Sequence, residues 1–284
     1  MRIYTNLFDS LPIVYNQLNV ISFQRDAHQL LFRKQLKEWS SKKEVEEGFC
    51  ILSIIECDVT NKEVDFLEIF GGCLDLLDTK SLHQWIRYMF ENNEELVELY
   101  RNLKTTIDNT FHGTVLSIDD IKIEFDVYDQ IFDSLLKNMD ITIMNDANFL
   151  TVLDYRKLLI KIWLQLKNNG KHKILVYHYP ESDFSKVEWK KWLEFTNDLP
   201  ITIICFTSSE VLIKELSLNQ IHLIQENRAR YELEDLQREL LHFNLQQEDL
   251  SIEQLTALIA YRDFRNELCL MDDRWVQFIK SQKY

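Results

Sequence analysis

The chain has 284 residues, of which 46% are hydrophobic and 12% aromatic, so a folded protein with a real core is expected and disorder is excluded. The net charge of -14 argues against a surface that coats nucleic acid all over, but it leaves room for a local basic groove and for bound divalent cations. Five scattered cysteines without a CxxC pair argue against a disulfide framework and a zinc site.

Four runs of β-branched and aromatic residues predict strands in the N-terminal part of the chain. These runs are residues 12–15, 19–23, 49–55 and 64–70. Asp26 is expected to cap a helix that runs to about Trp39, because leucines follow it at helical spacing. The last of the four runs ends in Gly71 and Gly72, which indicate a turn.

The middle of the chain is predicted to be mainly helical. Apolar residues recur at helical spacing in residues 78–90, 93–111 and 150–167, and Gly113 is expected to end the second helix. The intervening segment 118–133 alternates apolar and charged residues, most clearly from Ile121 to Asp126. It is either a short strand or the acid-rich start of a helix.

A strand, a helix and a second strand follow within about 34 residues. Residues 173–177 and 201–206 are continuously apolar, and Ser185 is expected to cap the helix between them. This order is a βαβ crossover, which implies a parallel pair of strands with both faces covered. Residues 221–224 are predicted to form one more small strand.

The composition changes after about Asn227, where three charged segments have a helical pattern. They are residues 228–243, 251–265 and 272–280. Ser251 begins a capping box with Gln254. We expect a helical extension that packs on the body of the protein or on another subunit.

Motifs of catalysis are largely missing. The chain contains no phosphate-loop pattern, and residues 24–28, where such a loop would lie, include no glycine. Nucleotide hydrolysis is therefore not expected. His178, Glu181 and Asp183 follow a predicted parallel strand, where ligands of α/β proteins usually bind. A polar loop with helix caps is the favoured interpretation of these three residues.

Six carboxylates lie within fifteen residues of the alternating segment. They are Asp119, Asp120, Glu124, Asp126, Asp129 and Asp133. Hard cations such as Ca²⁺ require several carboxylate oxygens at close range, but the segment lacks the glycine of an EF-hand loop. Metal binding and a solvated acidic face are both open, and the solvated face is the commoner arrangement. Basic residues are scattered along the chain and form no dense run.

The order of these parts resembles the type II-A CRISPR adaptation family sometimes written Csn-two. KILVYHYPESDFSKVEWKKWLEFTNDLPITIICFTSSEVL, residues 173–213, is similar to that family's strand, acidic loop, helix, strand and polar loop. Residues 66–90 resemble its glycine turn and the opening helix of an inserted lobe, and residues 121–143 resemble its acidic segment and following helix. The resemblance spans roughly residues 1–226 and rests on order and spacing.

The resemblance implies a fold and an assembly. The expected fold class is α/β, with a degenerate P-loop or nucleotide-binding-like parallel sheet domain formed by residues 1–78 and 147–226, an inserted helical lobe at 79–146 and a helical C-terminal extension at 227–284. It also implies a cytoplasmic, ring-shaped homotetramer that is not an enzyme. Its central channel would hold double-stranded DNA entered from free ends, and Ca²⁺ would hold the ring in shape.

The resemblance further implies partners and site residues. The protein would act in spacer acquisition for antiviral defence, together with the CRISPR integrase complex and the guide-RNA nuclease, and not at a membrane. Glu124 and Asp126 are the best candidates for Ca²⁺ ligands, and Asp119, Asp120, Asp129 and Asp133 are weaker ones. Lys137 is the first candidate for a channel lysine, followed by Lys104 and Arg101. A degenerate P-loop NTPase or kinase-like enzyme and a plain interaction scaffold are the competing hypotheses.

Overall fold

The structure is a computed structural model. In it the chain forms two compact units. One is Met1–Leu74 together with Asn169–Tyr284, and the other is Asp75–Asn168. The described residues are 2–5, 11–40, 53–55, 64–73, 86–89, 91–111, 115–118, 121–124, 151–166, 171–243, 250–267 and 273–282.

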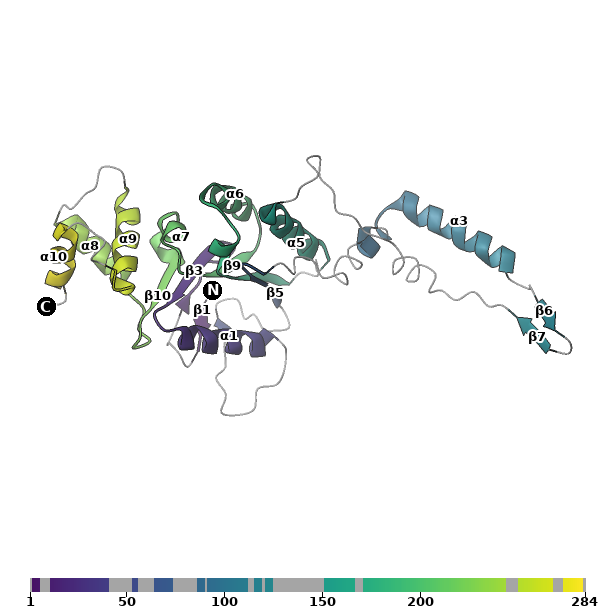
Figure 1. Cartoon of the computed structure of the whole chain (residues 1–284), viewed down its shortest axis with the longest axis horizontal. Coiled ribbons are helices and arrows are strands. Elements are labelled where there is room, and N and C mark those ends of the chain that lie inside the picture. The colour runs from purple at the N-terminus through teal and green to yellow at the C-terminus, as the bar shows by residue number, and fades with distance from the viewer. Residues whose placement is uncertain are drawn as a thin grey trace. The chain divides into compact units, whose positions relative to one another are not determined.

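A sheet of five parallel strands forms the centre of the first unit, in the order β10-β3-β9-β8-β5 (Figure 1). The strands are β3 (Leu18–Phe23), β5 (Val64–Phe70), β8 (His172–His178), β9 (Thr202–Phe206) and β10 (Ile221–Ile224). The predicted βαβ crossover is confirmed, since β8 and β9 are parallel neighbours joined through helix α6 (Lys186–Asn197). The first unit is therefore an α/β domain.

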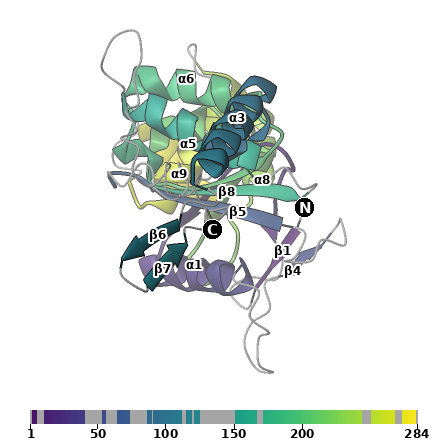
Figure 2. The same cartoon turned by 90° about the vertical axis from the view of Figure 1, so that its right-hand side faces the viewer.

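Alternate side chains of the strands point to opposite faces of the sheet. Phe23 and Phe206 face helix α1 (Asp26–Ser40), where their ring centroids lie 5.8 and 5.7 Å from that of Phe32. Tyr177 points the other way, and its ring centroid lies 5.4 Å from that of Trp192 on α6. Helices α1 and α6 therefore cover opposite faces of the sheet, as Figures 1 and 2 show.

A small antiparallel sheet in the order β2-β1-β4 extends the cover on the α1 side. Its strands are β1 (Arg2–Tyr4), β2 (Leu11–Pro12) and β4 (Ser53–Ile55). The prediction of a strand over residues 12–15 was wrong beyond Pro12. There the Asn19 side chain accepts a hydrogen bond from the Val14 amide at 2.8 Å and donates one to the Val14 carbonyl at 2.9 Å, so Val14 pairs with a side chain instead of a neighbouring strand.

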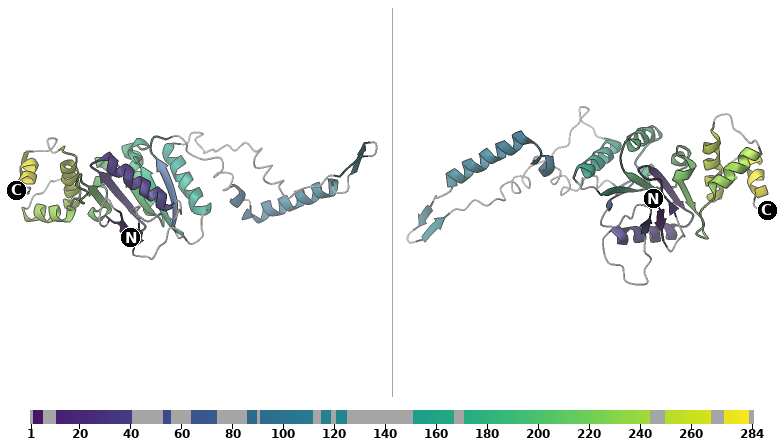
Figure 3. Two further views of the ribbon diagram at one scale, coloured as in Figure 1. Left: turned by 90° about the horizontal axis from the view of Figure 1, so that it is seen from below. Right: turned by 180° about the vertical axis from the view of Figure 1, so that it is seen from behind.

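The C-terminal helices belong to the same unit as the parallel sheet. They are α7 (Glu210–Lys214), α8 (Leu233–His242), α9 (Ile252–Phe264) and α10 (Asp273–Gln282). Figure 3 shows the last three, in yellow-green to yellow, gathered near the C-terminus. Helix α9 contacts α7, α8 and β10, and most of its residues are buried. The predicted capping box at its start is confirmed between Ser251 and Gln254. The extension therefore packs on the body of its own chain.

The prediction that a helix begins at residue 228 was wrong. Arg228 has a left-handed backbone with φ of 71°, and the Tyr231 amide donates to the Leu223 carbonyl at 2.8 Å. The chain thus turns back along β10 before α8 begins at Leu233. A polar, charged sequence is compatible with both a turn and a helix, so its pattern did not distinguish them.

The described residues of the second unit contain a short helical segment at residues 86–89, two longer helices and a hairpin. Helix α3 (Glu94–Phe111) leads to strands β6 (Val115–Ile118) and β7 (Ile121–Glu124), and α5 (Val152–Leu166) follows later in the chain. Strands β6 and β7 are antiparallel, with Val115 opposite Glu124. Of the two alternatives for the alternating segment, a strand is therefore observed over residues 121–124.

Candidate functional site

The carboxyl edge of the parallel sheet is where the fold gathers its polar residues. Ligands of open α/β sheets usually bind at this edge, because strand ends and helix starts meet there. The last residues of the five strands are Phe23, Phe70, His178, Phe206 and Ile224. We therefore describe the turns that follow these strands as the candidate functional site.

The turn between β3 and α1 is filled by contacts with the C-terminal part of the chain. The Gln24 amide donates to the Ile224 carbonyl at 2.9 Å. The Gln24 side chain donates to the Phe264 carbonyl at 2.9 Å and accepts from the Glu226 amide at 2.9 Å. A phosphate loop instead leaves several backbone amides directed at its ligand. This turn binds the chain's own strands and helix α9.

The turn after β8 has a strained backbone, and it packs closely against Gly71 in the turn after β5. Tyr179 adopts a left-handed conformation with φ of 50°, which is uncommon for a bulky residue. The Gly71 amide donates to the His178 carbonyl at 2.7 Å, and a Cβ atom at Gly71 would lie 1.9 Å from the Tyr179 carbonyl oxygen. Only glycine allows the two turns to approach so closely.

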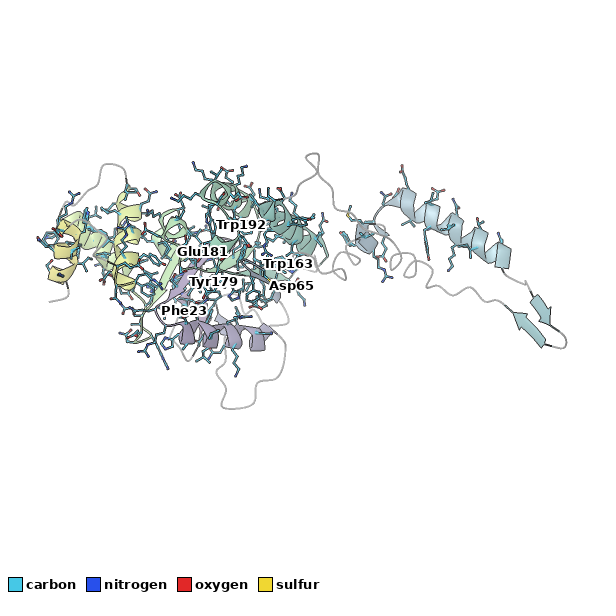
Figure 4. The ribbon with its side chains drawn as sticks, in the orientation of Figure 1. Phe23, Asp65, Trp163, Tyr179, Glu181 and Trp192 are labelled. Carbon is cyan, nitrogen blue, oxygen red and sulfur yellow. The ribbon has the colours of Figure 1, made fainter. Side chains whose placement is uncertain are left out.

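Glu181 and Asp183 tie this turn to its neighbours (Figure 4 labels Glu181). Glu181 accepts hydrogen bonds from the Thr207 hydroxyl and the Ser208 amide, both at 2.8 Å. Asp183 accepts from the Gly72 amide at 2.7 Å and from the Tyr177 hydroxyl. Both carboxylates thus hold loop groups, in agreement with the interpretation that they belong to a polar loop.

His178 is the last residue of β8, and its side chain is buried. Its side chain is 2% exposed, and its ring stacks between Phe70 and Phe206 with centroid distances of 4.5 and 4.9 Å. Its Nε2 atom lies 2.8 Å from the Glu68 carboxylate, which also accepts from Arg33 at 3.1 Å. The hydrogen bond from His178 and then the charge and hydrogen bond of Arg33 lower the pKa of Glu68, against the opposing effect of burial. These contacts are those of a histidine that stabilises the fold.

Helix α9 packs against α7, next to the carboxyl edge of the sheet. Arg262 donates to Glu210 at 2.9 Å, and Lys214 forms an ion pair with the same carboxylate at 2.8 Å. Burial raises the pKa of Glu210, but the hydrogen bonds of the two cations outweigh it and lower the pKa overall. Tyr261 is buried beside them, its hydroxyl has no partner among the described residues, and burial raises its pKa to about 12.

Most of the sequence-predicted site residues lie outside the described part of the chain. These are Asp119, Asp120, Asp126, Asp129, Asp133 and Lys137. Glu124 is the last residue of β7, whereas Arg101 and Lys104 lie on α3, where Arg101 is exposed and Lys104 is half-buried. No group of three or more metal-ligating side chains occurs among the described residues. The Ca²⁺ ligands and channel lysines therefore stay predictions.

Sequence reasoning missed the contacts that define the edge. The close approach of Gly71 to Tyr179 and the hydrogen bond from Gln24 to Phe264 join residues that are distant in the chain. No local sequence pattern reveals such contacts. Only the Gly71-Gly72 pair at the end of an apolar run gave a signal, since it indicated a turn. Within the described residues, no helix is long and apolar enough to cross a membrane.

The fold is similar to that of a solved protein. No protein-family model matches the chain, and no curated protein matches it either. A crystal structure of Stu0660 of Streptococcus thermophilus aligns with a TM-score of 0.70 at 12% sequence identity, over 92% of this chain and 86% of that chain. At this identity the likeness concerns the fold alone. The chain thus shares its α/β architecture, over nearly its whole length, with Stu0660.

Proposed function

We propose that this protein binds the ends of double-stranded DNA as a homotetrameric ring and acts, without catalysis, in CRISPR spacer acquisition. The proposal starts from the sequence resemblance to the type II-A adaptation family, which spans roughly residues 1–226. The shared fold with Stu0660 supports the α/β architecture that this resemblance requires. In the proposed role, partners are the integrase complex and the guide-RNA nuclease.

The filled carboxyl edge is the observation that best supports a non-enzymatic head. Gln24 occupies the turn where a phosphate loop would lie, and it binds Phe264 of the extension and Glu226. A nucleotide would have to displace these contacts to reach the strand ends. The proposal therefore gives the sheet a scaffolding role and assigns DNA binding to basic residues elsewhere.

Calcium is assigned to the acidic segment at residues 119–133. In the proposal, Glu124 and Asp126 bind Ca²⁺ and so remove the mutual repulsion of the six carboxylates. In the proposal, DNA contacts come from Lys137, Lys104 and Arg101, because phosphate binding needs several cations on one surface. The DNA affinity should then fall steeply with salt.

A comparison of linear and closed-circular duplex tests the proposal. In electrophoretic shifts with Ca²⁺, we expect the full chain to bind linear DNA and not covalently closed DNA, and to lose this binding when a chelator removes Ca²⁺. Lys137→Gln should weaken binding, whereas the matched control Lys190→Gln, on an exposed position of α6, should not. Equal binding to both DNA forms would overturn the threading of ends.

Two other functions are separate outcomes of the same set of measurements. A degenerate NTPase or kinase-like enzyme requires nucleotide binding, so calorimetric heat with ATP or GTP would favour it over the proposal. A plain interaction scaffold requires no DNA binding at any Ca²⁺ concentration. Either result would replace the proposed function.

A further inference from the structure

A cavity of about 450 Å³ lies between the turn after β10 and the helices of the C-terminal extension, at a place that the proposed function does not use. Helix α8 forms one wall through Leu236 and Glu239, which lie on the same face because they are three residues apart. Tyr231, Asp263 and Ile279 line the other sides, from the turn after β10 and from helices α9 and α10. Small-molecule sites typically have volumes of roughly 300–1,000 Å³.

The cavity is held open by a rigid turn. The Gln225 amide donates to the Ala229 carbonyl at 2.9 Å, and the Tyr231 amide donates to the Leu223 carbonyl at 2.8 Å. A bridge between Ile224 and Arg230 fixes the same turn against β10. These backbone hydrogen bonds already fix the conformation of this wall of the cavity, so a ligand would not have to order it on binding.

One of the residues that line the cavity is a buried carboxylate. Asp263 is 5% exposed, and the Tyr231 hydroxyl donates a hydrogen bond to it at 3.0 Å. Burial, followed by the charge and hydrogen bond of Asp263, raises the pKa of Tyr231, so the phenol stays a neutral donor. Asp263 belongs to the last turn of α9, where the helix dipole already makes the potential negative. The charge of Asp263 and the negative end of the helix dipole would both attract a cation in the cavity.

The rest of the lining matches a cation that has an apolar stem. Four carboxylates and one guanidinium, that of Arg230, line the cavity. The four are Glu232, Asp235, Glu239 and Asp263. Arg230 pairs with Glu232 at 3.4 Å, and Asp235 pairs with Arg238 of the same helix, so the inference below uses the other two carboxylates. Leu236 and Ile279 provide apolar surface beside them. The cavity therefore has charge for a cationic head and hydrophobic contact for an aliphatic chain.

We infer that this cavity binds an ammonium or guanidinium group on an aliphatic stem. Glu239 and Asp263 hold the charged head, and Leu236 and Ile279 contact the stem. The head can belong to a free polyamine or to an arginine or lysine side chain of a partner. The inference does not depend on the DNA-binding role, because none of the residues that line the cavity is a proposed DNA or Ca²⁺ contact.

Calorimetric titration of the full chain tests the inference with three probes. N-acetyl-arginine amide represents a protein side chain, spermidine represents a polyamine, and N-acetyl-citrulline amide is the neutral counterpart of the first. We expect saturable binding of one cation per chain and none of the citrulline compound. Binding of the arginine compound alone would identify a side-chain ligand, and binding of spermidine alone would identify a polyamine.

Matched variants separate the cavity from the general acidity of the chain. Glu239→Gln should weaken binding about tenfold, as loss of a charged hydrogen bond predicts. Asp263→Asn should weaken it as well, and Glu239→Gln keeps the test decisive if the buried Asp263→Asn variant does not fold. Glu234→Gln removes the same charge from an exposed position of α8 outside the cavity and should leave binding unchanged. No saturable binding, or equal loss in Glu234→Gln and Glu239→Gln, would overturn the inference.

Discussion

Gly71 is the residue that allows the ends of β5 and β8 to meet. Its amide binds the His178 carbonyl, and its missing side chain leaves room for the Tyr179 carbonyl. The neighbouring Gly72 is required for a different reason, since it has a left-handed φ of 72° while the nearest atom to a Cβ there is 3.6 Å away. The two adjacent glycines therefore have separable roles.

Gly71→Ala should destabilise the fold more than Gly72→Ala. The first change forces a methyl group to within 1.9 Å of a backbone oxygen, so the strand ends must separate. We expect a loss of about 3 kcal/mol for Gly71→Ala and about 1 kcal/mol for Gly72→Ala, measured by denaturant unfolding. Equal losses in the two variants would show that the close contact with Tyr179 does not control stability.

His222 is a second residue whose burial has a measurable consequence. Both nitrogens of its ring are buried on β10 without a partner among the described residues. Burial, and then the charge of Arg230, lowers its pKa to about 3. Between its ordinary pKa of 6.5 and about 3, the unfolded chain takes up a proton that the folded chain does not. Stability due to this group must therefore fall as the pH falls.

His222→Leu should remove most of that pH dependence. Between pH 6.5 and 5 the wild-type chain should lose on the order of 2 kcal/mol through this histidine, and the leucine variant should not. The variant should also be no less stable at neutral pH, because it no longer buries two unsatisfied ring nitrogens. Denaturant unfolding at several pH values measures this. His242→Leu, at an exposed histidine of α8, is the control and should keep the wild-type slope.

At the scale of elements, helix α9 connects the extension to the sheet. Gln24 binds its last carbonyl, and Arg262 binds Glu210 at the start of α7. Arg262 and Glu210 have partly buried side chains, with 22% and 27% exposure. Their interaction is thus less screened by solvent than a surface pair.

Arg262→Met should loosen α9 without unfolding the sheet. The variant keeps an unbranched apolar stem but removes the guanidinium, which leaves Glu210 with Lys214 as its remaining described cation. We expect a cost of about 1 kcal/mol and faster hydrogen exchange at the amides of α9, with β8 unchanged. Arg265→Met, at an exposed position, should not change the exchange. Uniformly faster exchange across the sheet would mean that α9 and the strands unfold together.

The sequence predicted elements well where burial alone decides them. Strands β5 and β10 have the predicted limits, because both runs are rich in β-branched and aromatic residues, which favour a strand in a covered sheet. Residues 228–232 were predicted wrongly because their backbone follows β10, a long-range partner that local spacing does not encode. The same reason applies to the site, where Gly71 and Gln24 act through residues far along the chain.

At the scale of the whole molecule, the proposed ring gives a prediction about Ca²⁺. Replacing Glu124 by Gln and Asp126 by Asn removes the two best candidate ligands. We expect this double variant to dissociate from tetramers under Ca²⁺ concentrations that keep the wild-type chain assembled, as measured by light scattering. Glu194→Gln with Glu215→Gln removes two exposed charges elsewhere and should leave assembly unchanged. Unchanged tetramers in both double variants would assign Glu124 and Asp126 to the solvated face.

The strand order of the sheet also has a consequence during synthesis on the ribosome. Strand β3 lies between β9 and β10, but these neighbours are translated only at residues 202–206 and 221–224. The nascent chain therefore carries the apolar segment LNVISF without its partners while most of the protein is still being made. Such a long delay predicts slow folding and a need for chaperone protection of this segment. Premature termination before residue 221 should yield an aggregating product instead of a smaller folded domain.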